Sequence, residues 1–469
     1  MDDVIKETAN LAQLPYSNCK TKIVDLKSLD VPESASEEEY QRLYTQYTQK
    51  RDGNAASLRD AIESIKFGIA PPVAFPTETV YGLGADATSQ ASIAGIFAAK
   101  GRPSDNPLIV HAASAAHLER LTGEPIPEVY RELVQQFWPG PLTILFPVPR
   151  HSRFAPNVHP GQSTIGFRVP SSKYARFFIA ATDRPIAGPS ANSSGKPSPT
   201  TAQHVMDDLK GKINFILDGG TCDVGVESTV LDGLHDPPLI LRPGGVSQAE
   251  LIAHGLKFGN KFSKTAIGYK RHDSKLLDNE QYYEPDVNGA PRAPGMKYRH
   301  YAPKGRLILF SDTAVAAQRP SQVLQELISS AGKPLKIGII SCRWAPFAGL
   351  PVSTAHDNPP PILLQSPYRA VVSTATYDQD EQRRHNLILY DAHLGPDIMT
   401  LAHFLFGILR LFDDLQCDYI FAESVPLTLD QQRRQPRGKS DSIEPELDSD
   451  IRDAVADRIE KAAAERIDE

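Results

Sequence analysis

Residues 75–87 read Phe-Pro-Thr-Glu-Thr-Val-Tyr-Gly-Leu-Gly-Ala-Asp-Ala and continue a short apolar run that begins at Val73. An apolar run followed by proline and glycine predicts a buried strand and then a turn. The run contains G-x-G-x-x-A, a weak form of the dinucleotide-binding fingerprint. The next predicted helix begins only at Ala91. A nucleotide-binding turn and an ordinary glycine turn therefore both stay open on this segment alone.

Strand and helix patterns alternate on both sides of this run, from residue 58 to residue 258. Helices are expected at 58–67, 91–99, 127–137 and 202–209, and Ser247 with Glu250 forms a capping box that begins another. Strands are expected at 73–75, 107–111, 142–146, 164–169, 186–188, 215–218, 228–232 and 239–242. The alternation predicts a mixed α/β fold.

The flanking segments suggest four parts in the chain. Residues 1–57 are expected to be an N-terminal extension or insertion, with a strand at 21–26 and one exposed helix within 32–57. Residues 58–258 form the main α/β domain, and 259–303 form a polar linker. Residues 304–469 form a second α/β domain, in which strands at 307–310, 335–340 and 419–422 and helices at 323–330, 398–415 and 451–464 predict a small parallel sheet.

Composition excludes several classes of protein. With 41% hydrophobic and 23% charged residues, the 469-residue chain resembles an average globular protein, not a disordered or fibrous one. The net charge of −7 equals that of residues 441–469 alone, where eleven acidic and four basic side chains occur (4 − 11 = −7), so a globally basic nucleic-acid binder is not supported. The acidic N-terminus and the lack of a long apolar run predict a cytoplasmic protein with no membrane span.

Two loops carry groups suited to phosphates. Residues 100–111 read KGRPSDNPLIVH and place Lys100 and Arg102 on a proline-stiffened loop, where they could grip a phosphate. His111 ends an apolar strand and is open to interpretation as a packed histidine or as a ligand-binding one. Residues 187–201 read AGPSANSSGKPSPTT and join a strand to a helix, which suits a polyoxyanion or, alternatively, a serine-rich turn capped by Thr201.

Smaller pieces add to these loops. Thr164 and Arg168 lie on one face of a predicted strand, Ser228 begins another strand, and Arg242 ends a third. A buried strand that ends in arginine usually means a bound anion or a carboxylate partner. The combination predicts binding and positioning of a nucleotide for phosphoryl-type chemistry. The four scattered cysteines predict neither a zinc site nor a disulfide framework.

The runs FPTETVYGLGA, KGRPSDNPLIVH, WPGPLTILF, SANSSGKPSPT, GVESTV and LRPGG, in this order, resemble the threonylcarbamoyl-AMP synthase family in its two-domain form. The linker run APGMKYRHYAP resembles the segment that joins the two domains of that family. The resemblance implies a YrdC-like catalytic domain with a twisted, mixed sheet, and a smaller Rossmann-like domain after it. It also implies synthesis of L-threonylcarbamoyl-AMP and pyrophosphate from L-threonine, bicarbonate and ATP.

The resemblance also implies site residues, position by position. Four residues would form the catalytic, phosphate-holding set: Lys100, Arg102, Ser190 and Asn192. The wider ATP site would add Asn106, Thr164, Thr200, Arg242 and, from the linker acting as a lid, Tyr301 with Tyr298. The L-threonine site would comprise Thr77, Thr79, His111, Arg168, Ser190 and Ser228, with Arg168 holding the carboxylate.

The expected cofactor is Mg²⁺ that arrives with ATP, because no carboxylate cage for a protein-bound metal is visible. The product would pass to a tRNA threonylcarbamoyl transferase complex for N6-threonylcarbamoyladenosine next to the anticodon, and weak tRNA binding is a further expectation. A mitochondrial copy stays open. Two alternatives use the same concave face of the sheet: a carbamoyltransferase of the hydrogenase-maturation type, and a non-catalytic RNA-binding module.

Overall fold

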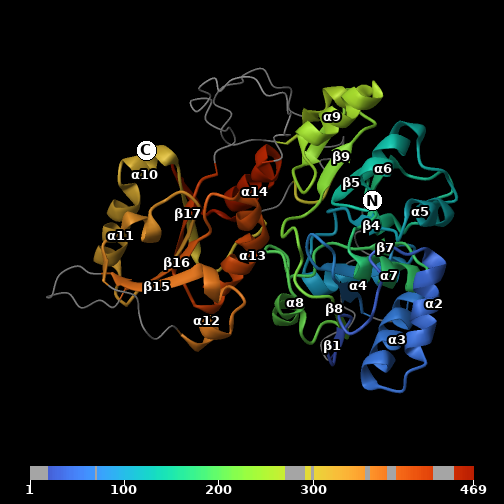
Figure 1. Cartoon of the computed structure of the whole chain (residues 1–469), viewed down its shortest axis with the longest axis horizontal. Helices are drawn as coiled ribbons and strands as arrows, with labels where there is room; N and C mark the ends of the chain where they lie inside the picture. The colour runs from blue at the N-terminus through green and yellow to red at the C-terminus, as the bar shows by residue number, and fades with distance from the viewer. Residues whose placement is uncertain are drawn as a thin grey trace. The chain divides into compact units, whose positions relative to one another are not determined.

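The computed structural model describes residues 19–68, 71–269, 291–296, 300–353, 360–377, 387–425 and 448–469. The chain divides into two compact units, one made of Met1–Ser194 with Ser198–Tyr298 and the other of Gly195–Pro197 with Arg299–Glu469 (Figure 1). Both units combine sheets with helices, which confirms the predicted α/β class. Among the described residues, no helix is long and apolar enough to cross a membrane.

Eleven strands within the described part of the first unit form one mixed sheet. Their spatial order is β1 (Lys22–Asp25), β8 (Phe215–Asp218), β2 (Val73–Phe75), β3 (Gly82–Asp86), β7 (Ile186–Ala187), β4 (Ile109–His111), β6 (Thr164–Arg168), β5 (Leu142–Pro147), β9 (Thr229–Asp232), β10 (Leu239–Arg242) and β11 (Ala266–Ile267). Strand β6 pairs in parallel with β4 and antiparallel with β5. Both orientations therefore occur next to each other, as expected for a mixed sheet.

Helices cover both faces of this sheet, and each face has its own apolar core. The helices are α2 (Glu37–Thr48), α3 (Gly53–Lys66), α4 (Gln90–Lys100), α5 (Ala115–Thr122), α6 (Arg131–Phe137), α7 (Lys173–Thr182), α8 (Ala202–Leu209) and α9 (Gln248–Phe258). Alternation along β2 places Ala74 in one core, and Val73 and Phe75 in the other. A sheet that is buried on both faces explains the continuous apolar runs of its strands.

The glycine-rich run is a strand and not the nucleotide-binding turn that the fingerprint suggested. Residues Gly82–Asp86 form β3, which pairs antiparallel with β2 and β7. A Cβ atom at Gly82 would lie 2.8 Å from the ring of Phe75, so glycine is needed here for close packing across the strand pair.

The described part of residues 1–57 belongs to the first unit. Strand β1 confirms the predicted strand at 21–26, and it forms the edge of the sheet beside β8. The prediction of an exposed helix within 32–57 is only half correct. Helix α2 is present, but Tyr40 and Tyr47 on it are buried in the core that α7 also lines. Helix α3 begins earlier than predicted, because the side chain of Asp52 caps it.

The described ends of the expected linker also pack on the first unit. Residues Lys261–Lys264 form a 3₁₀ turn, and β11 extends the sheet beside β10. At the far end, Ala293 is fully buried in a small apolar cluster with Leu145 and Leu241. Arg292 forms an ion pair with Asp232. These contacts fix residues 291–296 as a strap on the first unit.

The described part of the second unit holds a seven-stranded sheet. Its order is β14 (Val352–Ser353), β15 (Val372–Tyr377), β16 (Ile388–His393), β13 (Lys336–Ser341), β17 (Tyr419–Glu423), β12 (Arg306–Phe310) and β18 (Glu465–Ile467). The five strands from β16 to β18 pair in parallel, as predicted, whereas β14 and β15 are antiparallel. The predicted final helix ends at Ala462, and β18 follows it.

Figure 1 shows helices on both sides of this second sheet. Helices α10 (Asp312–Ala316) and α11 (Arg319–Ser330) cover one face, and α13 (Ile398–Asp414) and α14 (Asp448–Ala462) cover the other. The short α12 (Pro361–Gln365) lies near β15. A predominantly parallel sheet between two helical layers is the architecture of Rossmann-like domains.

Replacing Gly244 by alanine is expected to destabilise the first unit. A Cβ atom at this position would lie 2.1 Å from the backbone nitrogen of Thr229 and 2.4 Å from the carbonyl oxygen of Glu227. Backbone atoms cannot yield as a side chain can, so we expect a loss of about 1–3 kcal/mol in the free energy of unfolding. Urea denaturation measures this loss. Gly53→Ala is the control, because its Cβ would meet no atom within 4 Å; equal midpoints for the two variants would contradict the prediction.

Candidate active site

Lys100 joins the two loops that the sequence singled out. It is the last residue of α4 and is buried, and its ammonium group donates to the carbonyl oxygen of Ser190, to the carbonyl oxygen of Asn192 at 2.7 Å and to Oδ1 of Asn192 at 3.2 Å. The backbone nitrogen of Ser194 donates to the carbonyl oxygen of Lys100 at 2.8 Å. Lys100 of the K-x-R pair (Lys100 and Arg102) therefore contacts both residues of the S-x-N pair (Ser190 and Asn192), about 90 residues further along the chain. In this state the ammonium group holds the second loop in place.

Arg168, at the end of β6, is the centre of a second cluster. Its Nη2 donates to Oε1 of Glu78 at 2.6 Å, its Nη1 to Oγ1 of Thr79 at 3.0 Å, and its Nε to the carbonyl oxygen of Gly140 at 3.2 Å. Oγ1 of Thr79 also lies 2.9 Å from Oγ1 of Thr77. The structure thus brings three predicted threonine-site residues together. Strand β3, which follows the loop with Thr77 and Thr79, is joined to Ser190 by a bridge at Gly82.

Ser228 and Arg242 form a third cluster, where β9 begins and β10 ends. Nε and Nη2 of Arg242 donate to the carbonyl oxygen of Ser228 at 3.1 and 2.8 Å, and Nη2 also donates to its Oγ at 3.1 Å. Oγ1 of Thr143 lies 2.8 Å from the same hydroxyl. Nη1 of Arg242 reaches the carbonyl oxygen of Pro294 in the strap at 3.4 Å. A predicted ATP residue and a predicted threonine residue are therefore direct neighbours.

The remaining predicted ATP residues lie around Pro107 and at the start of α8. Nη2 of Arg102 donates to the carbonyl oxygen of Pro107 at 3.0 Å, and Thr164 and Pro107 line the same small cavity, together with Arg292 and Pro294 of the strap. Asn106 is buried, and its Oδ1 accepts no hydrogen bond within the described structure. Thr200 is also buried, and its backbone nitrogen donates to Nδ1 of His204 at 3.2 Å.

His111 lies beside Arg168 in the register of β4 and β6. Its Nδ1 is 3.3 Å from the carbonyl oxygen of Ile186, and its ring meets that of Phe75 edge to face. Burial, together with the Arg168 guanidinium, lowers the pKa of His111 to about 3. The ring is therefore neutral at physiological pH, and it can donate or accept a hydrogen bond there without carrying a charge.

Stability is expected to fall as the pH is lowered below about 6.5, the ordinary pKa of histidine. Since the folded pKa of His111 is lower than the unfolded one, the unfolded chain takes up the proton first. The contribution of neutral His111 to the free energy of unfolding is complete above pH 6.5. As the pH falls toward the folded pKa of about 3, this contribution decreases by at most about 1.4 kcal/mol per pH unit. Urea denaturation at pH 7, 6, 5 and 4 measures the slope. His111→Gln should make the dependence of stability on pH shallower. An unchanged slope would contradict the lowered pKa of His111.

Two linker tyrosines, Tyr298 and Tyr301, are predicted to lie over the ATP site. Tyr298 lies outside the described residues. Tyr301 belongs to the second unit, where its ring packs 5.1 Å from that of Phe406 and lies 5.7 Å from the guanidinium carbon of Arg458. The contact of Tyr301 with ATP stays a prediction.

Sequence reasoning missed Glu78, although it lies between two residues that were selected. Its side chain is 5% exposed, and the exposed fraction of its partner Arg168 is 4%. A signal was available, because a glutamate between buried strand segments needs a cation partner. What the sequence could not supply was the identity of that partner, 90 positions further along the chain.

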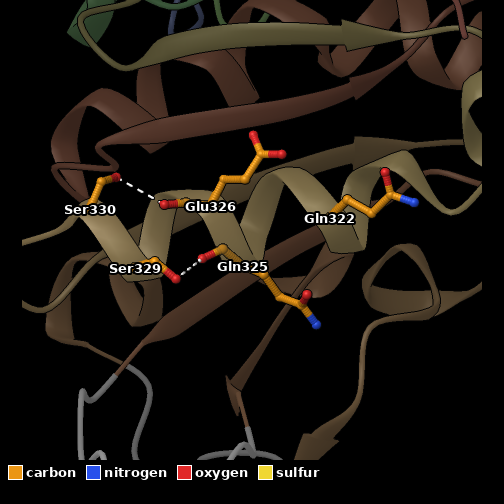
Figure 2. A pocket seen from close by; sticks show the side chains of 5 residues that line it. All are labelled: Gln322, Gln325, Glu326, Ser329 and Ser330. Atoms are coloured by element: carbon orange, nitrogen blue, oxygen red, sulfur yellow. Dashed lines mark hydrogen bonds between the residues drawn. The ribbon is translucent and has the colours of Figure 1, made fainter.

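Figure 2 shows side chains that line a hollow elsewhere, along one face of α11 in the second unit. It is lined by Gln322, Gln325, Glu326, Ser329 and Ser330. Both serine hydroxyls donate to carbonyl oxygens of their own helix, Ser329 to Gln325 at 2.8 Å and Ser330 to Glu326 at 2.9 Å. A single helix face with satisfied hydroxyls does not form a binding site. Among the described residues, no three histidine, cysteine or carboxylate side chains gather as metal ligands.

The first unit, a mixed sheet with three buried polar clusters, is followed by a unit of Rossmann-like architecture, and family comparisons identify the class of enzyme that has this organisation. The Sua5/YciO/YrdC family model, described as telomere recombination, matches residues 71–244. A second model, described as the C-terminal domain of threonylcarbamoyl-AMP synthase, matches residues 266–464. These two matches and the relatives described next show that the chain belongs to the threonylcarbamoyl-AMP synthase family, in its two-domain form.

Individual relatives agree with this assignment. The threonylcarbamoyl-AMP synthase of Schizosaccharomyces pombe is 39% identical over 349 residues, which is 69% of this chain and 81% of the relative. That of Pyrococcus abyssi is 38% identical over 377 residues, covering 79% and 92% of the two chains. The crystal structure of P. abyssi Sua5 complexed with L-threonine superposes with a TM-score of 0.63 and 32% identity, covering 96% of this chain and all of that one.

Proposed function

We propose that this chain makes L-threonylcarbamoyl-AMP and pyrophosphate from L-threonine, bicarbonate and ATP. Membership of the family supports the reaction, and the relative from P. abyssi was solved with L-threonine bound. The observation in this chain that carries the proposal is that the first unit holds both the buried Arg168 cluster and the buried contacts of Lys100, with a bridge between Gly82 and Ser190. The cation proposed for the threonine carboxylate, Arg168, and the cations proposed for the ATP phosphates, Lys100 and Arg102, then belong to the same unit.

The chemistry needs positioning more than it needs a protein nucleophile. Threonine and bicarbonate form a carbamate with loss of water, and one oxygen of the carbamate bonds to the α-phosphorus of ATP. The bond from that phosphorus to the bridging oxygen breaks, and pyrophosphate leaves with the electron pair. Holding a short-lived carbamate in line with the phosphate can supply about 7–11 kcal/mol of the barrier reduction.

The roles proposed for the side chains follow from their charge and position. Lys100 and Arg102, with Ser190 and Asn192, hold the ATP phosphates and offset the charge that develops on the leaving pyrophosphate. Mg²⁺ enters bound to ATP and supplies further positive charge there. The other ATP contacts are Asn106, Thr164, Thr200, Arg242 and Tyr301. Arg168 binds the threonine carboxylate among Thr77, Thr79, His111, Ser190 and Ser228.

The product carries the threonylcarbamoyl group to a tRNA threonylcarbamoyl transferase complex, which places it on the adenosine next to the anticodon. The mixed anhydride between carbamate and phosphate hydrolyses easily. A separate transferase that takes it up directly fits this reactivity.

Pyrophosphate release from ATP tests the proposal when L-threonine and bicarbonate are omitted in turn. We expect release only when both are present. Release without threonine would indicate another acyl acceptor, as a carbamoyltransferase would require. No release, together with salt-dependent tRNA binding, would indicate the RNA-binding module instead.

A further inference from the structure

Glu78 is a buried carboxylate to which the proposed reaction gives no role so far. It lies in the loop between β2 and β3, directly between Thr77 and Thr79. Its Oε1 accepts from Nη2 of Arg168 at 2.6 Å. Its other oxygen, Oε2, is buried and accepts no hydrogen bond within the described structure. A buried carboxylate oxygen without a donor is costly, and it needs an explanation.

Arg168, the partner of Glu78, has N–H donors that the described contacts do not use. A guanidinium carries five N–H groups. In the described structure three of them have acceptors: the carbonyl oxygen of Gly140, Oγ1 of Thr79 and Oε1 of Glu78. Two N–H groups of Arg168 and one carboxylate oxygen of Glu78 therefore remain without partners among the described residues.

The charges of this pair determine what it can bind. Glu78 already neutralises Arg168, so a ligand with only a carboxylate would add an unbalanced negative charge to a buried site. An α-amino acid brings one carboxylate and one ammonium group two bonds apart. Its carboxylate faces the guanidinium and its ammonium faces the free carboxylate oxygen, so that positive and negative groups alternate.

We propose that Glu78 recognises the amino group of L-threonine, with Oε2 accepting one of its N–H groups while Arg168 holds the carboxylate. This inference rests on the proposed function and names a residue for its specificity. The nitrogen keeps one N–H after it has been carboxylated, so the same contact orients the carbamate. Glu78 is then a specificity-determining residue that restricts the site to substrates with an α-amino group.

The test compares L-threonine with 2,3-dihydroxybutanoate of matching configuration, which carries a hydroxyl group in place of the amine. Both ligands are titrated into the full-length wild-type protein and Glu78→Gln by calorimetry. The amide oxygen of glutamine still accepts from Arg168, but an NH₂ group replaces the acceptor Oε2. We expect Glu78→Gln to weaken L-threonine binding about 10- to 100-fold and binding of the analogue less than about 2-fold.

The outcomes separate the inference from the function on which it rests. Equal weakening of both ligands would mean that Glu78 only supports Arg168, and it would overturn the inference, as would unchanged binding of both. A wild-type protein that binds no L-threonine would overturn the proposed function and the inference together. Glu78→Asp, which keeps the charge on a shorter side chain, should retain the preference for threonine, and unchanged ATP binding confirms that each variant is folded.

Discussion

Replacing Lys100 by alanine is expected to reduce pyrophosphate release about 100- to 1,000-fold, the usual effect of removing one charge-stabilising donor from an active site. Two effects combine. The phosphates lose a cation, and the carbonyl groups of Ser190 and Asn192 lose the donor that holds their loop. Initial rates of pyrophosphate release, with threonine and bicarbonate saturating, give the measurement.

A matched control separates this effect from a general loss of positive charge. Lys257 also lies in the last turn of a helix, α9, and its ammonium group is 5.0 Å from the ring of Phe258. Lys257→Ala should keep the wild-type rate within about 2-fold, since a surface cation contributes little. A Lys100→Ala rate within 10-fold of the wild-type rate would show that neither role of Lys100 is essential.

Replacing Arg168 by alanine is expected to lower the free energy of unfolding by about 3–5 kcal/mol, because it leaves the carboxylate of Glu78 buried without its cation. The same variant should lose threonine-dependent pyrophosphate release. Urea denaturation measures the first effect. A second substitution, Glu78→Gln, removes the unpaired charge and should restore part of the lost stability.

Arg120 provides the control for this prediction. It also faces two carboxylates, Glu37 at 3.1 Å and Asp183 at 2.7 Å, but its side chain is 51% exposed. Surface pairs of this kind contribute about 0–1 kcal/mol. Arg120→Ala should therefore cost much less than Arg168→Ala, and similar losses for the two variants would contradict the account of a desolvated pair in the site.

The regular elements were predictable where apolar residues set a clear period. Strands β2, β8 and β10 and the capping box at Ser247 lie where the sequence places them. Strand β3 was not predictable, because Gly82 and Gly84 suggest a turn when neighbours are unknown. The ring of Phe75 fills the space where their Cβ atoms would be, and only the folded sheet shows this.

Residue types in the site were predictable, and their pairing was not. The composition of the K-x-R and S-x-N loops indicates anion binding. The ammonium group of Lys100 holds the S-x-N loop. This contact depends on the place of β7 in the sheet and on how α4 packs against the sheet. The same holds for Glu78 and Arg168, since a contact across 90 positions follows from strand order and not from local pattern.

The most direct test of the proposed reaction follows the carbon of bicarbonate. The full-length protein is incubated with ATP, L-threonine and ¹³C-labelled bicarbonate, and the nucleotide products are identified at once by mass spectrometry. We predict an AMP adduct that carries the threonyl group and one ¹³C atom and that disappears when threonine is omitted. Pyrophosphate release without a labelled, threonine-containing nucleotide would contradict the proposed reaction.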